Sequence, residues 1–219
     1  MMARSLGIIL LTLITISAAS CGKKGLSLKI GDQDVLALGY IHSCNFVQNS
    51  QGLRVSWKSA KPVHFIISKS VPPEYDSTIH MAAHIWNSTL NTGLINVHRD
   101  DSIPNGPGDD RLNMIYWVTD WPNDMAQEQA RTSIRWDVSK LRDADIRVNA
   151  THYQFFKEGV TPVSSQISLL SLMLHEMGHG VGLKHIEDAS SVMQTYLGSG
   201  MTREAPGKVD TDSLGCEYQ

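Results

Sequence analysis

A run of five residues, His175-Glu176-Met177-Gly178-His179, sets the first condition on how this chain folds. Positions i and i+4 of an α-helix share one face, so both histidines can present their imidazoles to a single metal ion. Glu176 is turned by about 100° from His175 around the helix axis and can reach a metal-bound water without being a ligand itself. The run therefore predicts a helix whose histidine face borders a cleft.

Two later residues extend this pattern. Gly182 tolerates the positive φ needed to end a helix and redirect the chain, and His185 follows where it can return as a third ligand. Three neutral imidazoles with one open position are typical of a catalytic zinc site, whereas structural sites close the fourth position, usually with thiolates. Given nine His and 17 Gly, the full pattern should arise by chance only about 4 × 10⁻⁵ times in this chain. The alternative interpretation is a pair of core histidines beside an unrelated glutamate.

Hydrophobic patterning predicts five strands. Val63–Ser68 is a β-branched run typical of a buried strand, and Leu112–Thr119 has the strongest strand pattern in the chain. The other three strands are expected at Leu94–Val97, Arg131–Val138 and Asp145–Asn149.

Two long helices are predicted from apolar residues that recur every three or four positions. The first opens at Pro72-Pro73-Glu74 and ends at Gly93, and the second begins near Ser164-Ser165 and carries the histidine pair. The order of strand, helix, four strands and helix predicts an α+β fold in which a sheet rests on the two helices. The expected buried faces are Tyr75, Ile79, Ala82, Trp86 and Leu90 on the first helix, and Ile167, Leu170, Leu174, Met177 and Val181 on the second.

Charge and composition exclude some classes of protein. The 19 Lys and Arg residues against 22 Asp and Glu give a net charge of −3, which argues against a basic surface that binds nucleic acid. A chain with 42% hydrophobic and 19% charged residues is globular in composition, and its length suits one domain. We therefore expect a single folded domain that is monomeric and binds no nucleic acid.

The N-terminus has the features of an export signal. Met1–Arg4 is a short positive start, and Leu6–Ala19 runs for 14 residues without a charge, which predicts a signal peptide over residues 1–20 rather than a membrane span. Ala18-Ala19-Ser20 before Cys21 resembles the lipobox of bacterial lipoproteins, in which the cysteine becomes the first mature residue and carries lipid. The resemblance implies an exported protein anchored by lipid at the bacterial outer membrane or cell surface. The alternative is an ordinary signal peptide and a secreted protein.

Two cysteines remain in the part of the chain expected to fold. Residues 21–35, rich in Gly and Lys, are expected to form a tether, and residues 36–219 the domain. An oxidising compartment favours a disulfide between Cys44 and Cys216, which would join the start of the domain to its end. The alternative is two buried, inert thiols.

Two other groups of residues could hold a second metal. His80 and His84 have i, i+4 spacing on the first predicted helix, although an exposed pair without a metal is the alternative. Four aspartates flank a loop rich in Gly and Pro and could bind Ca²⁺, although a solvated acidic loop is the alternative. These are Asp100, Asp101, Asp109 and Asp110.

The pattern His175-Glu176-xx-His179-xx-Gly182-xx-His185 resembles the motif of the metzincin zinc proteases, in which a methionine turn follows downstream. Ser191-Val192-Met193 supplies such a turn, and its close spacing from His185 is similar to that of the matrixins. Ala144–Asn149 and Asp210–Tyr218 resemble a sheet strand and the closing helix of bacterial matrixin-like enzymes. The resemblance implies a metzincin-like catalytic domain with a five-stranded twisted mixed sheet, two long helices, a zinc cleft and a Met-turn.

The resemblance also implies what these residues do. The three histidines would hold Zn²⁺, Glu176 would act as the catalytic general base, and Met193 would lie beneath the metal as a hydrophobic floor. The protein would be a zinc endopeptidase whose extended polypeptide substrate pairs with the edge strand, expected at Ala130–Ile134. Matrixins usually have Tyr-Pro after the methionine, and Gln194-Thr195 here leaves the preference of the S1′ pocket open. Tyr196 is expected in packing or in a pocket wall.

Two other functions stay open at this point. One is a surface-anchored binding protein that keeps a non-catalytic zinc. The other is a zinc hydrolase that acts on a non-protein amide, such as one in the cell wall, although the Met-turn argues against it.

Overall fold

The computed structural model describes residues 44–219, except residues 59, 105, 107 and 164. The predicted signal peptide, Cys21, the tether and the first residues of the predicted domain lie outside the described residues. Across the described part of the chain, no helix combines the length and apolar character needed to cross a membrane.

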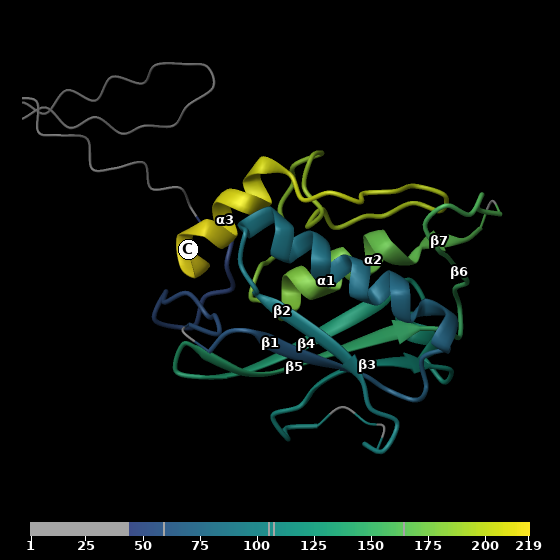
Figure 1. The fold of residues 1–219 in the computed structure, drawn as a ribbon, viewed down its shortest axis with the longest axis horizontal. Coiled ribbons are helices and arrows are strands. Elements are labelled where there is room, and N and C mark those ends of the chain that lie inside the picture. The colour runs from purple at the N-terminus through teal and green to yellow at the C-terminus, as the bar shows by residue number, and fades with distance from the viewer. Residues whose placement is uncertain (1–43, 59, 105, 107, 164) are drawn as a thin grey trace, which may run out of the picture. The chain divides into compact units, whose positions relative to one another are not determined.

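A five-stranded mixed sheet forms the base of the fold (Figure 1). Its strand order is β2-β1-β3-β5-β4, and β4 is antiparallel to β5 while the other neighbours are parallel. This confirms the predicted α+β fold and places the segment expected at the substrate edge on an outer strand. The strands are β1 Val63–Ile67, β2 Ile95–Arg99, β3 Asn113–Val118, β4 Ala130–Asp137 and β5 Lys140–Asn149.

The sequence prediction placed the start of β5 too late. The strand begins at Lys140 rather than Asp145, so β4 and β5 form a tight hairpin. Asp143 gives the stretch before the predicted strand the polarity of a loop, yet Asp143 and Asp145 are both fully buried. Arg135 of β4 pairs with both carboxylates, and Asp145 also accepts from the backbone N–H of Met114 at 3.2 Å. Buried charges with such partners are compatible with a strand interior.

The first long helix, α1 Asp76–Leu90, follows a 3₁₀ turn at Pro73–Tyr75. Its predicted buried face is confirmed at Ile79, Ala82, Trp86 and Leu90, whereas Tyr75 lies in the preceding turn and stacks on Trp117 with ring centroids 5.3 Å apart. The helix ends at Leu90 and is capped by Asn91, which has φ +51°, so it does not continue to Gly93 as predicted. Asparagine tolerates this left-handed conformation and can replace glycine at a helix end.

The second long helix, α2 Leu169–Gly180, begins later than the predicted Ser164-Ser165. Ile167 and Ser168 instead form the short strand β7, which pairs with β6 Phe155–Phe156. Ser168 then caps the helix by accepting from the N–H of Ser171 at 3.2 Å. The predicted apolar stripe is buried throughout, and the helix is buried on most of its surface.

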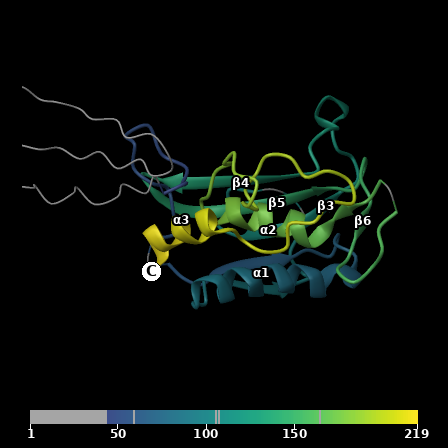
Figure 2. The same cartoon turned by 90° about the horizontal axis from the view of Figure 1, so that it is seen from above.

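The two long helices cover one face of the sheet, and the loop between β2 and β3 lies on the other (Figure 1). Viewed after a 90° turn, α2 lies between α1 and the β4 edge (Figure 2), in agreement with its packing against both. Trp86 joins the helices by donating from Nε1 to the carbonyl of Leu174 at 3.0 Å. This packing fixes α2 directly beside the edge strand.

The C-terminal helix, α3 Lys208–Tyr218, is joined covalently to the start of the described chain. Cys44 and Cys216 form a disulfide, with Cα atoms 6.1 Å apart. Nearby, Glu217 pairs with Arg54 and Lys58 at 2.9 Å each. Because the disulfide closes a loop of 172 residues, loop-closure entropy alone could stabilise the fold by about 5 kcal/mol.

Candidate metal centre

Helix α2 and the turn after it bring the three predicted histidines together. His175 and His179 lie on one face of α2, with their rings edge to face and centroids 4.6 Å apart. The helix ends at Gly180, and Gly182 adopts φ +104°, which confirms the predicted turn at this glycine. The chain then places His185 beside the pair, with ring centroids 5.0 Å from His175 and 4.7 Å from His179.

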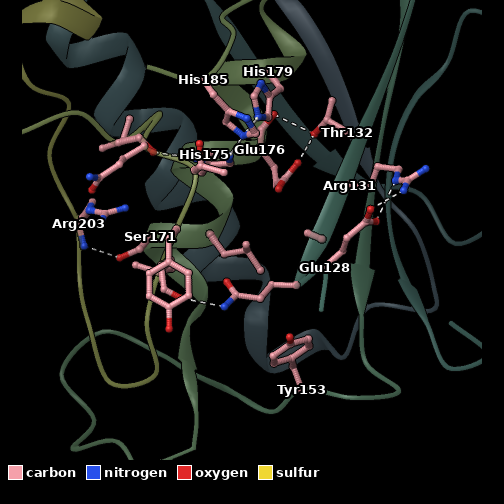
Figure 3. Close-up of a pocket in the computed structure, with 18 of the residues that line it drawn as sticks. Glu128, Arg131, Thr132, Tyr153, Ser171, His175, Glu176, His179, His185 and Arg203 are labelled. Atoms are coloured by element: carbon pink, nitrogen blue, oxygen red, sulfur yellow. Dashed lines mark hydrogen bonds and ion pairs between the residues drawn. The ribbon is translucent and has the colours of Figure 1, made fainter. Parts of the chain in front are cut away.

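The Nε2 atoms of the three rings form a nearly equilateral triangle (Figure 3). The distance is 3.0 Å between His175 and His179, and 3.1 Å from each of them to His185. Among the His, Cys, Asp and Glu side chains of the described residues, these three histidines are the group whose ligand atoms converge closely enough to hold a metal.

Backbone carbonyls fix how the first two rings present their nitrogens. Nδ1 of His175 lies 2.8 Å from the carbonyl oxygen of Val192, and Nδ1 of His179 lies 2.8 Å from that of Leu183. A carbonyl oxygen only accepts, so each Nδ1 carries the proton and donates it, leaving Nε2 with a free lone pair. Burial lowers the pKa of both histidines to about 4, so both rings are neutral at neutral pH.

This donor set fits zinc. Two unprotonated Nε2 atoms 3.0 Å apart share no hydrogen bond, and their lone pairs repel unless a cation lies between them. Imidazole nitrogens held at about 2.0–2.1 Å from a tetrahedral zinc are about 3.3 Å from each other, close to the spacing of these rings. Carbonyl oxygens behind the ligating histidines are also the usual outer partners at such sites.

A buried segment after the third histidine supports the triad from behind. Met193 is fully buried, and a Cβ added at Gly178 would overlap its sulfur, so the helix and this segment pack without space between them. The neighbouring Val192 supplies the carbonyl that orients His175. The predicted Met193 therefore lies against the histidine-bearing helix.

Asp210 of α3 holds this segment, a role that sequence reasoning missed. Its carboxylate accepts from the hydroxyl of Ser191 at 2.5 Å and from the N–H of Val192 at 3.0 Å, and it is almost completely buried. It also accepts from the N–H of Gly207 at 2.8 Å. An acidic residue in the first turn of a helix usually caps that turn, so the sequence alone gives no sign of the longer-range contact.

Glu176 lies beside the triad in a buried position. Glu176 is only 5% exposed, and its Oε2 accepts a hydrogen bond from the hydroxyl of Thr132 in β4 at 2.6 Å. Burial raises the pKa of the Glu176 carboxyl above its ordinary value, although the Thr132 hydrogen bond acts in the opposite direction. Thr132 was part of the predicted edge strand, but the sequence offered no reason to single it out.

A cavity of about 640 Å³ opens over these residues. One wall is the β4 side, residues 127–132, and another is the returning chain, residues 194–197, so the predicted edge strand does border the site. Gln129 joins the two walls by donating to the carbonyl of Leu197 at 2.8 Å. Tyr196 lines the cavity and is 71% exposed, which agrees with a wall position but not with packing in the interior.

The other candidate metal ligands do not converge. His80 and His84 are both exposed on α1, and no third ligand among the described residues joins them. The four aspartates each serve a different partner. Asp100 accepts from Ser102, Asp101 pairs with Arg99, Asp109 pairs with Arg142, and Asp110 accepts from the N–H of Leu112.

Comparison with known proteins agrees with this geometry. A search of curated proteins finds no match to the chain. The family model described as Matrixin matches residues 61–215, which include every strand of the main sheet, both long helices and all three histidines. A match over more than half of the chain establishes the family. The chain belongs to the matrixins, a family of zinc-dependent metallopeptidases.

Proposed function

We propose that this matrixin is an endopeptidase that uses His175, His179 and His185 as zinc ligands and Glu176 as general base. The observation that carries the proposal is the convergence of the three Nε2 atoms at 3.0–3.1 Å beside one buried carboxylate. Two of these imidazoles are neutral and oriented by backbone carbonyls, which favours metal binding, and three protein ligands leave one position of a tetrahedral zinc open.

Each group then has a defined task. Zinc bound by the triad would supply a Lewis acid that acidifies water and polarises the scissile carbonyl. Glu176 takes a proton from the attacking water and delivers it to the nitrogen of the departing amine. The carbonyls of Val192 and Leu183 hold the His175 and His179 rings in one orientation. Met193 closes the site from below as an apolar floor.

The substrate is an extended polypeptide that lies along β4. The outer edge of this strand is not paired within the main sheet, and its residues 130–132 line the cavity. An extended peptide can add to such an edge through main-chain hydrogen bonds. The contact between Gln129 and Leu197 would limit how far a substrate side chain enters the cavity.

Removal of zinc tests the proposal directly. The purified protein is expected to contain one zinc per chain by mass spectrometry and to cleave a quenched fluorescent peptide. A chelator should reduce cleavage to background because the three histidines alone supply no Lewis acid, and added Zn²⁺ should restore it. Chelator saturated with zinc beforehand is the control. Undiminished cleavage by zinc-free protein would reject the proposal.

The same assay separates two other outcomes. Bound zinc with no turnover of casein or of peptide libraries would indicate a binding protein with a non-catalytic metal. Turnover of peptidoglycan in place of protein would indicate a hydrolase for cell-wall amides. A cleavage-site profile from a peptide library would then define the preference of the S1′ pocket.

We also propose that the mature chain begins at Cys21, which carries lipid and anchors the protein outside the cytoplasm. The lipobox-like sequence supports this, and the Cys44–Cys216 disulfide fits an oxidising compartment. Mass spectrometry of the mature N-terminus should find an acylated Cys21, and Cys21→Ser should shift the protein from the membrane fraction to the soluble fraction. An unmodified Cys21 in membrane-bound protein would contradict the anchor.

A further inference from the structure

Thr132 is a polar residue in an apolar row. Alternate side chains of a strand share a face, so Ala130, Thr132 and Ile134 of β4 point the same way. Ala130 and Ile134 pack against the hydrophobic core beneath α2. Core packing alone would favour a third apolar residue at this position, so packing does not account for the hydroxyl group of Thr132.

The hydroxyl of Thr132 is engaged by one residue only. Its Oγ1 lies 2.6 Å from Oε2 of Glu176 and 3.1 Å from the backbone carbonyl oxygen of the same glutamate. A hydroxyl has one proton, and the shorter contact, to a carboxylate, is the stronger one. Because both acceptors belong to Glu176, the contact fixes the carboxylate relative to its own helix. Figure 3 shows Thr132 reaching across from the strand to Glu176.

We propose that Thr132 is a positioning residue for the general base, holding Oε2 so that Oε1 is presented for proton transfer. This inference rests on the proposed function. Glu176 is buried, and Thr132 is the described side chain that hydrogen-bonds its carboxylate. Without this donor the carboxylate could turn to another rotamer.

The contact also links the base to the substrate-binding edge. Thr132 lies in the strand on which an extended peptide would pair, while Glu176 lies in the helix that carries two metal ligands. One hydrogen bond therefore fixes the spacing between the peptide and the base. Misplacement of a catalytic group by about 1 Å can cost about 10²-fold in rate.

Three variants test the proposal through steady-state kinetics. Thr132→Val keeps the shape but loses the donor, and kcat is expected to fall about 10–100-fold with KM within about twofold of wild type. Thr132→Ser keeps the donor and should recover most of kcat. Thr89→Val makes the same change in α1, outside the cavity, at a threonine whose hydroxyl donates to the carbonyl of Ile85 in its own helix, and should match wild type. Wild-type kcat in Thr132→Val would overturn the proposal, as would equal loss in Thr132→Ser or a change confined to KM.

A second measurement does not depend on activity. Thr132→Val should lower the melting temperature by about 2–6 °C in wild type, because the buried carboxylate loses its donor, but by almost nothing in Glu176→Ala. Zinc content should stay at one per chain in every variant. Equal shifts in the two backgrounds would contradict the positioning contact. If the wild type binds zinc but cleaves no peptide, the proposed function fails while this coupling still decides whether Thr132 holds Glu176.

Discussion

Peptide hydrolysis is expected to fall by about 10³-fold or more when Glu176 is replaced by alanine, while the zinc content stays at one per chain. The reason is geometric. Glu128 and Glu176 are the two acidic side chains that line the cavity. Arg131 pairs with Glu128, so Glu176 is the carboxylate left to take a proton. The triad and its carbonyl partners do not involve the Glu176 side chain. The measurements are kcat/KM on a fluorescent peptide and metal content by mass spectrometry.

Two further variants separate the charge of Glu176 from its size and position. Glu176→Gln keeps the shape and the contact with Thr132 but cannot take a proton, so it should be as inactive as the alanine variant. Glu187→Ala removes an exposed glutamate close to His185 in sequence and should stay near wild type. Thermal stability should not fall in Glu176→Gln, because burial already disfavours the ionised carboxyl. Wild-type turnover by zinc-replete Glu176→Ala would mean that another group takes the proton.

The part of the site that could be predicted from sequence is the part built by local geometry. The i, i+4 spacing of His175 and His179 and the glycine before His185 determine their placement almost without reference to the rest of the chain. The Met193 segment was found through its family resemblance. The resemblance, together with the order of strands along the chain, suggested an edge strand at Ala130–Ile134, whereas the order of all five strands was not predicted.

Contacts between distant segments could not be predicted in the same way. Thr132 meets Glu176 across 44 residues, and Asp210 meets Val192 across 18. Nothing in either local sequence distinguishes these side chains from solvent-facing ones. The first contact depends on how α2 packs beside β4, and the second on how α3 folds back. Local sequence patterns do not determine either arrangement.

Errors at the ends of elements have the same origin. Ile167 fits an apolar position in a helix or in a strand, and pairing with Phe155 decides for the strand. Asp143 looks like a loop residue until Arg135 of the neighbouring strand is placed beside it. In both cases a partner remote from the local pattern selects the conformation that propensity leaves open.

The turn at Gly182 gives the second large prediction. Gly182→Ala is expected to destabilise the protein by about 2–5 kcal/mol and to weaken zinc binding. The residue has φ +104°, where a Cβ is strained, and that Cβ would lie 2.6 Å from the backbone oxygen of Val55 and 3.0 Å from the ring of Phe46. The strain costs about 1–2 kcal/mol, and overlap with a well-packed neighbour costs about 1–3 kcal/mol more.

A matched glycine separates these two costs. Gly52 also has positive φ, +74°, but a Cβ there meets nothing within 4 Å, so Gly52→Ala should show the backbone strain alone. Denaturant unfolding of both variants gives the loss in free energy of unfolding for each. The amount by which Gly182→Ala exceeds Gly52→Ala is then the cost of the overlap with Val55 and Phe46. These neighbours cannot retreat easily, because Val47 donates to the Gly182 carbonyl at 2.9 Å and accepts from Val55 at 2.8 Å. The strain must therefore pass along the chain toward His185, three residues on.

Zinc affinity, measured by competition with a chromogenic chelator, should fall in Gly182→Ala and stay unchanged in Gly52→Ala. Equal destabilisation of the two variants with unchanged affinity would show that this turn only ends the helix and does not hold the third ligand in place.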